Sequence, residues 1–299
     1  MKKKIVIITG LTASGKSGLA VDLARRFDGE IISADSVQIY KGLNIGSAKE
    51  SKAIRNEIHH HLISMKNFNE TYNVGQFIED CKIAINQVLA KNKLPIIVGG
   101  TGLYIKALME GYTLGSSAND EIREKYLSMA QEKGSLAVWH ELAQLNQTKA
   151  KSVHYNNLKR VIRYLEIELA GDNSTTTESI LNPFDVCAVG IIEDREIIYN
   201  RINARVDSML DDGLEQEVAG LVELGATRDM QAFNSIGYKE WFDYFDGKAD
   251  RQTTIDLIKQ HTRNYCKRQL TFLKTINNLK LLTLSEARKK IEEFLNDRT

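Results

Sequence analysis

Short, largely apolar runs alternate along this chain with longer stretches of helical periodicity. The apolar runs cover residues 5–8, 30–34, 94–98, 186–192 and 281–284. Runs of this length without polar alternation are typical of strands that are buried on both faces of a parallel sheet. Between them, residues 72–89 place apolar side chains such as Val74, Ile78, Cys81 and Ile85 at the spacing of one helix face. The pattern predicts an α/β fold, with a parallel sheet flanked by helices.

The pattern changes near residue 116. Residues 121–145 and 153–169 have amphipathic helical spacing and many charges, with no strand pattern between them. Residues 171–177 are polar and repetitive, as in a turn. We therefore predict a core domain formed by residues 1–115 and 186–299, and an all-helical insertion domain formed by residues 116–185.

The first apolar run leads into a phosphate-binding motif. Gly10-Leu11-Thr12-Ala13-Ser14-Gly15-Lys16-Ser17 matches G-x-x-x-x-G-K-[ST] at every fixed position, and a helical pattern follows it. In this strand–loop–helix context, backbone N–H groups and the helix N-terminus attract phosphate, the lysine reaches the outer phosphates and the Ser17 hydroxyl is offered to Mg²⁺. The core is therefore expected to be P-loop NTPase-like. The predicted phosphate-binding residues are Gly10, Thr12, Ala13, Ser14, Gly15, Lys16 and Ser17.

Two more loops follow predicted strands. Asp35 follows residues 30–34, and Gly99-Gly100-Thr101-Gly102 follows residues 94–98. Ligands of parallel α/β sheets bind beyond the carboxyl ends of the strands, so both loops should lie near the phosphate loop. A carboxylate there can hold Mg²⁺ or accept a proton. Asp35 could instead be an N-cap or a loop aspartate with a structural role, and a tight strand–helix turn favours glycine for its own reasons.

Basic residues gather on two predicted helices. Lys159 and Arg163 share one helical face, with Arg160 beside them and no acid within this short group. Residues 259–274 contain five cations and no acid, and helical spacing places four of them on one side as a basic ridge, namely Lys259, Arg263, Lys267 and Lys274. The opposite side carries Ile258, Tyr265, Phe272 and Ile276. Such cations suit nucleic-acid phosphates, although a solvated helix face remains the alternative.

Composition narrows the class of protein. The 299 residues include 40 Lys and Arg and 39 Asp and Glu, so a nucleic-acid surface must come from local clusters of cations. The three cysteines are far apart in sequence, which favours free thiols in a reducing cytoplasm.

Residues 59–61 are three consecutive histidines, but adjacent side chains of a strand point to opposite faces and converge poorly on one metal ion. No apolar run approaches the length needed to cross a membrane.

Eight segments together resemble the bacterial tRNA dimethylallyltransferases, over nearly the whole chain. They are GLTASGKS (10–17), IISADSVQIYKGLNIGSAK (31–49), HHLI (60–63), PIIVGGTGLYI (95–105), LKRVIRYLE (158–166), RINARVDSMLDDGL (201–214), SIGYKE (235–240) and TRNYCKRQLTFLK (262–274). Three departures from the usual family pattern are Leu11 in place of Pro, Asn157 in place of Asp and Phe272 in place of Trp.

The resemblance implies transfer of a dimethylallyl group from dimethylallyl diphosphate to the exocyclic N6 amine of the adenosine at tRNA position 37, next to the anticodon, with release of diphosphate. The adenine would have to leave its stack and enter a channel between core and insertion. The implied catalytic residues are Asp35, as the base that takes the amine proton, Lys16, Thr101 and Arg205, with Mg²⁺ at Ser17. The implied tRNA contacts are Asp35, Ser36, Val37, Gln38, Thr101, Arg123, Lys159, Arg160, Val161, Ile162, Arg163, Ser235, Ile236, Gly237, Tyr238, Lys239, Lys267 and Arg268. The protein is expected to act as a cytoplasmic monomer with tRNA and dimethylallyl diphosphate as partners and no membrane association.

Two other functions fit parts of the sequence. A small-molecule or nucleotide kinase would use the same P-loop with a helical lid, although the strand at 94–98 ends in Gly-Gly-Thr-Gly and only Glu193 and Asp194 offer a weak acidic Mg²⁺ site. A non-catalytic RNA-binding module with an unused P-loop is the second alternative.

Overall fold

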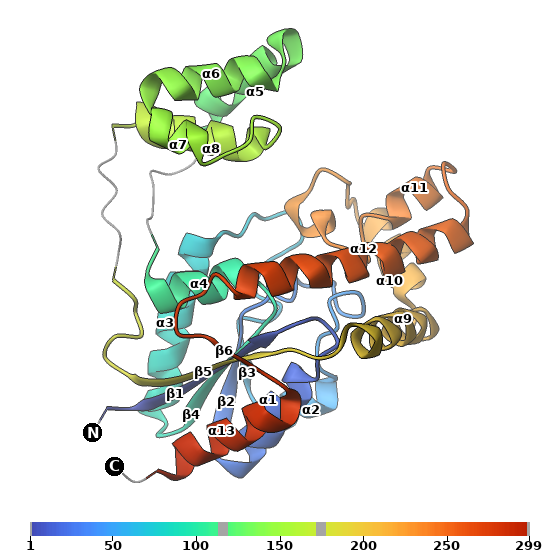
Figure 1. The fold of residues 1–299 in the computed structure, drawn as a ribbon. Helices are drawn as coiled ribbons and strands as arrows, with labels where there is room; N and C mark the ends of the chain where they lie inside the picture. Colours follow the sequence, from blue (N-terminus) through green and yellow to red (C-terminus); the bar gives the residue numbers. More distant parts are fainter. Residues whose placement is uncertain (1, 113–118, 172–177, 298–299) are drawn as a thin grey trace. The chain divides into compact units, whose positions relative to one another are not determined.

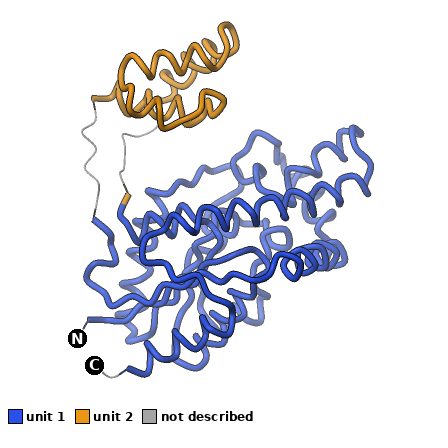
Figure 2. Tube along the Cα trace, viewed as in Figure 1, with its two compact units in different colours: residues 1–111, 178–299 blue, residues 112–177 orange. Residues whose placement is uncertain are grey.

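The computed structural model describes residues 2–112, 119–171 and 178–297. The chain divides into two compact units, one formed by residues 1–111 with 178–299 and the other by residues 112–177 (Figure 2). Each unit has its own hydrophobic core.

The larger unit is built on one parallel sheet. In the described residues it contains β1 (Lys4–Gly10), β2 (Gly29–Ser33), β3 (His60–His61), β4 (Leu94–Val98), β5 (Asp185–Ile191) and β6 (Lys280–Leu282), in the order β3-β2-β4-β1-β5-β6 (Figure 1). The central strand β1 pairs with β4 and with β5, which the chain reaches only after the smaller unit. The predicted α/β class with a parallel sheet is confirmed.

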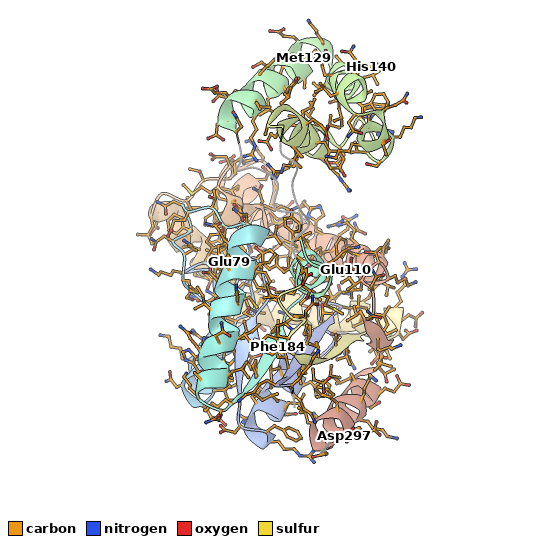
Figure 3. The ribbon with its side chains drawn as sticks, turned by 90° about the vertical axis from the view of Figure 1, so that its left-hand side faces the viewer. Glu79, Glu110, Met129, His140, Phe184 and Asp297 are labelled. Atoms are coloured by element: carbon orange, nitrogen blue, oxygen red, sulfur yellow. The ribbon has the colours of Figure 1, made fainter. Side chains whose placement is uncertain are left out.

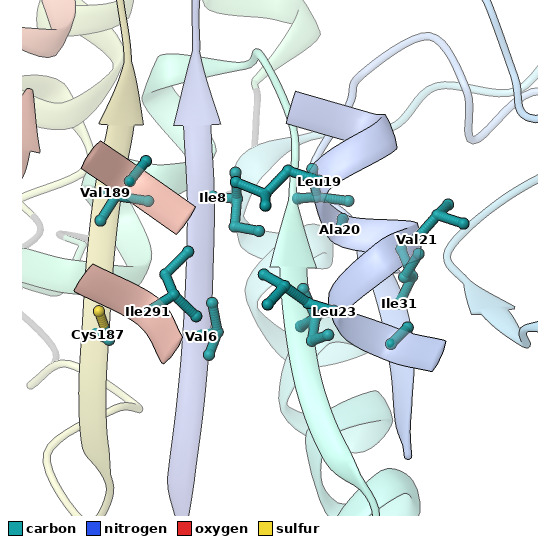
Figure 4. Close-up of a cluster of buried hydrophobic side chains, with 14 of the residues drawn as sticks. Val6, Ile8, Leu19, Ala20, Val21, Leu23, Ile31, Cys187, Val189 and Ile291 are labelled. Atoms are coloured by element: carbon teal, nitrogen blue, oxygen red, sulfur yellow. The ribbon is translucent and has the colours of Figure 1, made fainter. Parts of the chain in front are cut away.

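Helices cover both faces of this sheet. On one face lie α1 (Lys16–Arg26) and α13 (Leu284–Asn296), whose side chains join a cluster that includes Val6, Ile8, Leu19, Cys187 and Ile291, all almost fully buried (Figure 4). The other face is covered by α3 (Val74–Ala90), α4 (Gly102–Glu110) and α12 (Arg251–Leu273) (Figure 1). The apolar strands are therefore buried on both sides, as their sequence indicates.

The remaining helices lie beyond the carboxyl ends of the strands or beside the sheet. They are α2 (Lys52–Glu57), α9 (Arg195–Asp211), α10 (Leu214–Glu223), the 3₁₀ helix η1 (Gln231–Asn234) and α11 (Trp241–Phe245). Helix α9 packs against α10 and α12, which brings residues near 205 and 265 together although they are far apart in sequence (Figure 1).

In the described residues of the smaller unit, all regular secondary structure is helical. It contains α5 (Asp120–Lys133), α6 (Ser135–Leu145), α7 (Gln147–Lys151) and α8 (Leu158–Leu169), and Figure 3 shows Met129 on α5 and His140 on α6. Its core includes Tyr126, Val138, Leu142 and Leu165.

Two helix predictions in this unit were wrong in their limits. The stretch 121–145 is divided at Gly134, whose φ of +81° is incompatible with a continuous helix. Helix α8 begins at Leu158 rather than near Val153, because the Asn157 side chain accepts a hydrogen bond from the Arg160 N–H and caps the helix there.

The unit boundaries differ from the predicted limits of 116 and 185. Residue 116 lies outside the described residues. At the other end, residues 178–185 belong to the larger unit, where the Ser179 hydroxyl donates to the Leu108 carbonyl and Leu181 is buried. Most of the polar turn at 171–177 also lies outside the described residues. Within the described part of the chain, no helix combines the length and apolarity needed to span a bilayer.

Candidate active site

The P-loop is a tight turn whose shape depends on two glycines. Gly10 ends β1 with φ +142°, and a Cβ there would lie 2.4 Å from the Ile191 carbonyl oxygen. Gly15 precedes α1 with φ +86°. The backbone N–H of Leu11 donates to the Ile191 carbonyl, and that of Ser14 to the Leu11 carbonyl. The loop is thereby fixed against β5 before any phosphate binds.

Two cations are enclosed beside this loop. Lys16 Nζ donates to the Leu11 carbonyl at 3.1 Å. The pKa of Lys16 is lowered to about 8, chiefly by burial and in addition by the nearby Arg205 cation, although the Asp35 carboxylate acts in the opposite direction. Burial also lowers the pKa of Arg205, while Asp35 and Glu50 raise it. A cation that has lost hydrating water is less stable in its charged form, so an anion bound beside it stabilises that form.

Asp35 and Thr101 meet at the carboxyl ends of β2 and β4. Asp35 Oδ1 accepts hydrogen bonds from the Val37 and Gln38 N–H groups, at 2.9 and 3.3 Å. This carboxylate therefore has the structural role in a loop that is the alternative to a catalytic role. Thr101 Oγ1 accepts from the Ser36 N–H at 3.0 Å. The approach of the two loops is close, since a Cβ on Gly99 would lie 2.1 Å from the Ala34 carbonyl oxygen.

These groups line one pocket of about 370 Å³. The sequence-predicted residues that line it are Thr12, Lys16, Ser17, Asp35, Ser36, Val37, Gln38, Thr101, Arg205, Ser235, Ile236, Gly237, Lys239 and Arg268. Gly10, Ala13, Ser14 and Gly15 shape the P-loop behind them and are not among the lining residues. The P-loop, the Asp35 turn and the segment near 235 therefore share a cavity, although the chain separates them widely.

Sequence reasoning missed several residues of this pocket. Gln269 is buried, accepts from the Thr12 N–H at 2.9 Å and donates to the Gly100 carbonyl at 3.0 Å, so α12 joins two of the pocket's loops. Tyr265 donates to the same carbonyl at 3.3 Å. Gly46, Ser47 and Ala48 form another part of the wall. A signal for Gln269 did exist, because it is a polar residue at helical spacing from the buried Cys266 and Leu273.

Tyr238, which the family resemblance implies as a tRNA contact, is buried in the free protein. Its side chain is fully buried, and its hydroxyl donates to Glu217 Oε1 at 2.7 Å. Its neighbours Gly237 and Lys239 do line the pocket. Tyr238 therefore supports this wall from behind rather than facing the cavity.

Two of the four cations in the predicted basic ridge on α12 already contact side chains of another helix. Lys259 forms an ion pair with Asp207, and Arg263 donates to Asn203 Oδ1 at 2.7 Å. Both partners come from α9, which sequence spacing along α12 could not reveal. Lys267 and Arg268 are exposed, and Arg268 also lines the pocket.

One cation of the basic segment in the smaller unit is paired with an acid that lies just outside the segment. Glu166, which is 1% exposed, pairs with Arg163 at 3.1 Å and with Arg123 at 2.7 Å. One helical turn separates Glu166 from Arg163, so the two meet on the same face. Lys159 and Arg160 are exposed, and Arg160 lies over the Tyr164 ring. The side chains of Val161 and Ile162 belong to the core of this unit.

One group of His, Cys, Asp or Glu side chains in the described residues has the spacing of a metal site. Ligand atoms of Glu30, His59 and His61 lie within 4.8 Å of one another, so alternate histidines do converge although adjacent ones do not. His61 Nε2 is 2.8 Å from Glu30, and Lys91 Nζ lies 3.0 Å from each Glu30 oxygen. Because Lys91 already supplies the positive charge, we interpret the group as a structural hydrogen-bonded cluster.

Two protein-family models match the chain. The one described as "IPP transferase" matches residues 38–276, and the one described as "Isopentenyl transferase" matches residues 3–70. Among curated relatives, a tRNA dimethylallyltransferase of Exiguobacterium sp. is 43% identical over 274 residues, covering 91% of this chain and 88% of the relative. One from Streptococcus agalactiae is 38% identical over 303 residues and covers 99% of each chain.

Solved structures with the same fold carry related names. The full-length tRNA isopentenylpyrophosphate transferase of Bacillus halodurans has a TM-score of 0.72 at 35% identity, covering 98% of this chain and 96% of the other. A eukaryotic dimethylallyltransferase acting on tRNA has a TM-score of 0.76 at 27% identity, covering 98% of this chain and 77% of the other.

Proposed function

The chain belongs to the IPP transferase family, and from this premise we propose that it transfers a dimethylallyl group from dimethylallyl diphosphate to the N6 amine of the adenosine at tRNA position 37. The observation that carries the proposal is the pocket in which two desolvated cations, Lys16 and Arg205, face the Asp35 carboxylate. The cations suit a departing diphosphate, and the carboxylate suits an amine that must lose a proton.

The reaction assigns a distinct task to each group. The bond between the allylic carbon and the diphosphate oxygen breaks, and the diphosphate leaves with the bonding electron pair. Lys16 and Arg205 stabilise the negative charge that develops on this leaving group. A new bond joins N6 to the allylic carbon, and Asp35 accepts the proton that N6 releases. Thr101 fixes the Asp35 loop through its hydrogen bond with the Ser36 N–H.

Magnesium fits the donor atoms of this pocket. The Ser17 hydroxyl lines it, and oxygen donors are the ligands that Mg²⁺ prefers. Diphosphate and water would supply the other oxygen ligands, as is usual for this ion, and Asp35 stays available as the base. When bound, Mg²⁺ would supply further positive charge to the leaving group.

The tRNA would be bound by residues of both units. Pocket residues 35–38 and 235–239 would surround the target base, assisted by Lys267 and Arg268. The exposed Lys159 and Arg160, together with Arg123 and Arg163, would contact phosphates, since cations provide most of the sequence-independent affinity for nucleic acid. Action as a monomer in the cytoplasm completes the proposal, and the buried free cysteines at 81, 187 and 266 are compatible with a reducing compartment.

Incubation with dimethylallyl diphosphate and unmodified tRNA tests this function. We expect release of one diphosphate per modified tRNA, and mass spectrometry of the nucleosides should find one adenosine heavier by a dimethylallyl group. Turnover of ATP with a small acceptor, without diphosphate release from the allyl donor, would indicate a kinase instead.

A further inference from the structure

Two walls of the pocket lie face to face but come from distant parts of the chain. One wall contains Gly46, Ser47 and Ala48, in the loop that follows β2, and the other contains residues 235–237 and Lys239. Neither segment is a regular helix or strand, so the backbone hydrogen bonds of secondary structure do not fix these walls. Turn hydrogen bonds shape each segment, such as those from the Ala48 N–H to the Ile45 carbonyl at 2.8 Å and from the Lys239 N–H to the Ser235 carbonyl at 3.1 Å, but each of these bonds lies within one wall.

Glu217 on α10 meets both walls. Its carboxylate accepts hydrogen bonds from the backbone N–H groups of Asn44 at 3.0 Å, of Ile45 at 2.9 and 3.0 Å, and of Gly46 at 3.3 Å. The same carboxylate accepts from the Tyr238 hydroxyl at 2.7 Å, and that hydroxyl in turn accepts from the Ser47 N–H at 3.2 Å. One acidic side chain thus gathers three consecutive N–H groups of one wall and the buried tyrosine behind the other.

The packing around Glu217 leaves little freedom. A Cβ on Gly46 would lie 2.6 Å from the Tyr238 ring, so the two walls touch at this point. Glu217 does not itself line the pocket, and its carboxylate accepts from N–H groups and a phenol, while the Lys49 ammonium interacts with it electrostatically. Three N–H dipoles directed at one carboxylate stabilise its charge where a neutral amide would be a much poorer acceptor.

The contacts continue from this loop to the catalytic carboxylate. Gln38 Nε2 donates to the Ser47 and Ala48 carbonyls, at 3.2 and 3.3 Å. The backbone N–H of Gln38 donates to Asp35 Oδ1. A shift of the loop at 44–48 would therefore move Gln38 and Asp35. The P-loop is held by other partners, Ile191 and Gln269, and does not depend on this chain of contacts.

We propose that Glu217 is a positioning residue that holds the base-binding side of the pocket, and with it Asp35, in the reactive geometry. The inference rests on the proposed function, and it separates the pocket into two parts. The diphosphate side is fixed by the P-loop, whereas the tRNA side is fixed by Glu217 acting through the loop at 44–48 and through Tyr238.

Glu217→Gln tests this assignment with a change of one charge and almost no volume. The amide nitrogen of Gln cannot accept a hydrogen bond, so at least one backbone N–H loses its partner. We expect kcat/KM for tRNA to fall by about 10²-fold, the loss typical of an ångström-scale displacement of reacting groups. The affinity for inorganic diphosphate with Mg²⁺ should stay within twofold of wild type. Glu223→Gln, an exposed position on the same helix, is the matched control and should leave both quantities unchanged.

Tyr238→Phe keeps the three backbone contacts of Glu217 and provides a second variant if Glu217→Gln does not fold. Its expected loss in kcat/KM for tRNA is smaller, about tenfold, again with unchanged diphosphate affinity. Equal losses for tRNA and diphosphate, or a kcat/KM for tRNA within twofold of wild type in both variants, would overturn the assignment. Failure of the proposed function is recognised separately, because wild-type protein would then transfer no dimethylallyl group to tRNA.

Discussion

The two units of this protein hold their positive charge in different ways. In the larger unit, Lys16 and Arg205 are enclosed beside the P-loop, and burial lowers the pKa of each. In the smaller unit, Lys159 and Arg160 are exposed on α8, while Arg123 and Arg163 pair with the buried Glu166. Lys16 and Arg205 are partly removed from water, and within residues 2–112, 119–171 and 178–297 no carboxylate lies at salt-bridge distance from either. The cations of the smaller unit remain exposed or already pair with a carboxylate.

This difference suggests a division of tasks. Desolvated cations gain most from an anion that enters their cavity, because electrostatic interactions are stronger where water is excluded. Exposed cations gain less from each contact, and salt weakens that gain. We therefore expect substitutions in the larger unit to change chemistry and diphosphate binding, and substitutions in the smaller unit to change tRNA affinity and its salt dependence.

The largest expected effect comes from Asp35→Asn. The Asn oxygen can still accept from the Val37 and Gln38 N–H groups, so the turn should persist while the basic group is lost. We expect kcat to fall by about 10²–10⁴-fold, with tRNA affinity within twofold of wild type, as measured by single-turnover transfer and by filter binding. Asp211→Asn, an exposed residue at the end of α9, serves as the control. A loss below tenfold would remove Asp35 from the role of base.

Leu142→Ala tests whether the two units are independent. Leu142 is fully buried in the core of the smaller unit, so the substitution should destabilise that unit by about 2–5 kcal/mol. Diphosphate binding by the larger unit should persist while tRNA binding weakens, which thermal unfolding and titration calorimetry would measure together. Leu145→Ala, on the exposed side of the same helix, should have little effect. Loss of diphosphate binding in Leu142→Ala would contradict the separation of the units.

The pH dependence of diphosphate binding should report on Lys16. Its pKa of about 8 in the free protein means that the charged form, which binds the anion, is lost as the pH rises through 8. Affinity should therefore be greatest below pH 8 and fall by up to about tenfold per pH unit above it. Calorimetry at several pH values measures this decline.

Lys16→Arg should abolish that decline, because arginine stays charged throughout this range. Diphosphate itself also takes up and releases protons as the pH changes. Because this affects both proteins equally, dividing the wild-type affinity by the variant affinity at each pH removes it. Lys49, whose pKa burial lowers to about 8 as well, provides the comparison, and Lys49→Arg should leave the decline in place. The same slope in wild type and Lys16→Arg would rule out Lys16 as its source.

The smallest effect is expected at Arg160. Arg160→Ala should weaken tRNA binding several-fold and reduce the slope of log affinity against log salt by about 1, the value for one phosphate contact. Arg195→Ala is a close control, since Arg195 lies over Tyr199 four residues later just as Arg160 lies over Tyr164. Filter binding over a range of salt concentrations provides the measurement. An unchanged slope would show that Arg160 does not contact phosphate.

The sequence alone predicted the features that depend only on residues close together in the chain. The buried strands follow from short apolar runs, and the P-loop follows from eight consecutive residues that include Gly10 and Gly15. Position after a strand was also enough to bring Asp35 and Thr101 to one edge of the sheet, since parallel strands end on the same side.

Tertiary structure decided everything that depends on partners far apart in sequence. Gln269 reaches Thr12, Asp207 neutralises Lys259, and Glu217 gathers the loop at 44–46 together with Tyr238. Each of these side chains lies on a helix. The periodicity of a helix predicts which of its faces is buried, but not which residues that face contacts. The sequence thus determined the strands that follow apolar runs, the phosphate loop and the family resemblance. The folded chain alone decided the short strand β3, which charges are paired, which are enclosed and which side chain contacts both pocket walls. The physical reason is that burial and hydrogen bonding depend on three-dimensional neighbours, and spacing along one element does not contain that information.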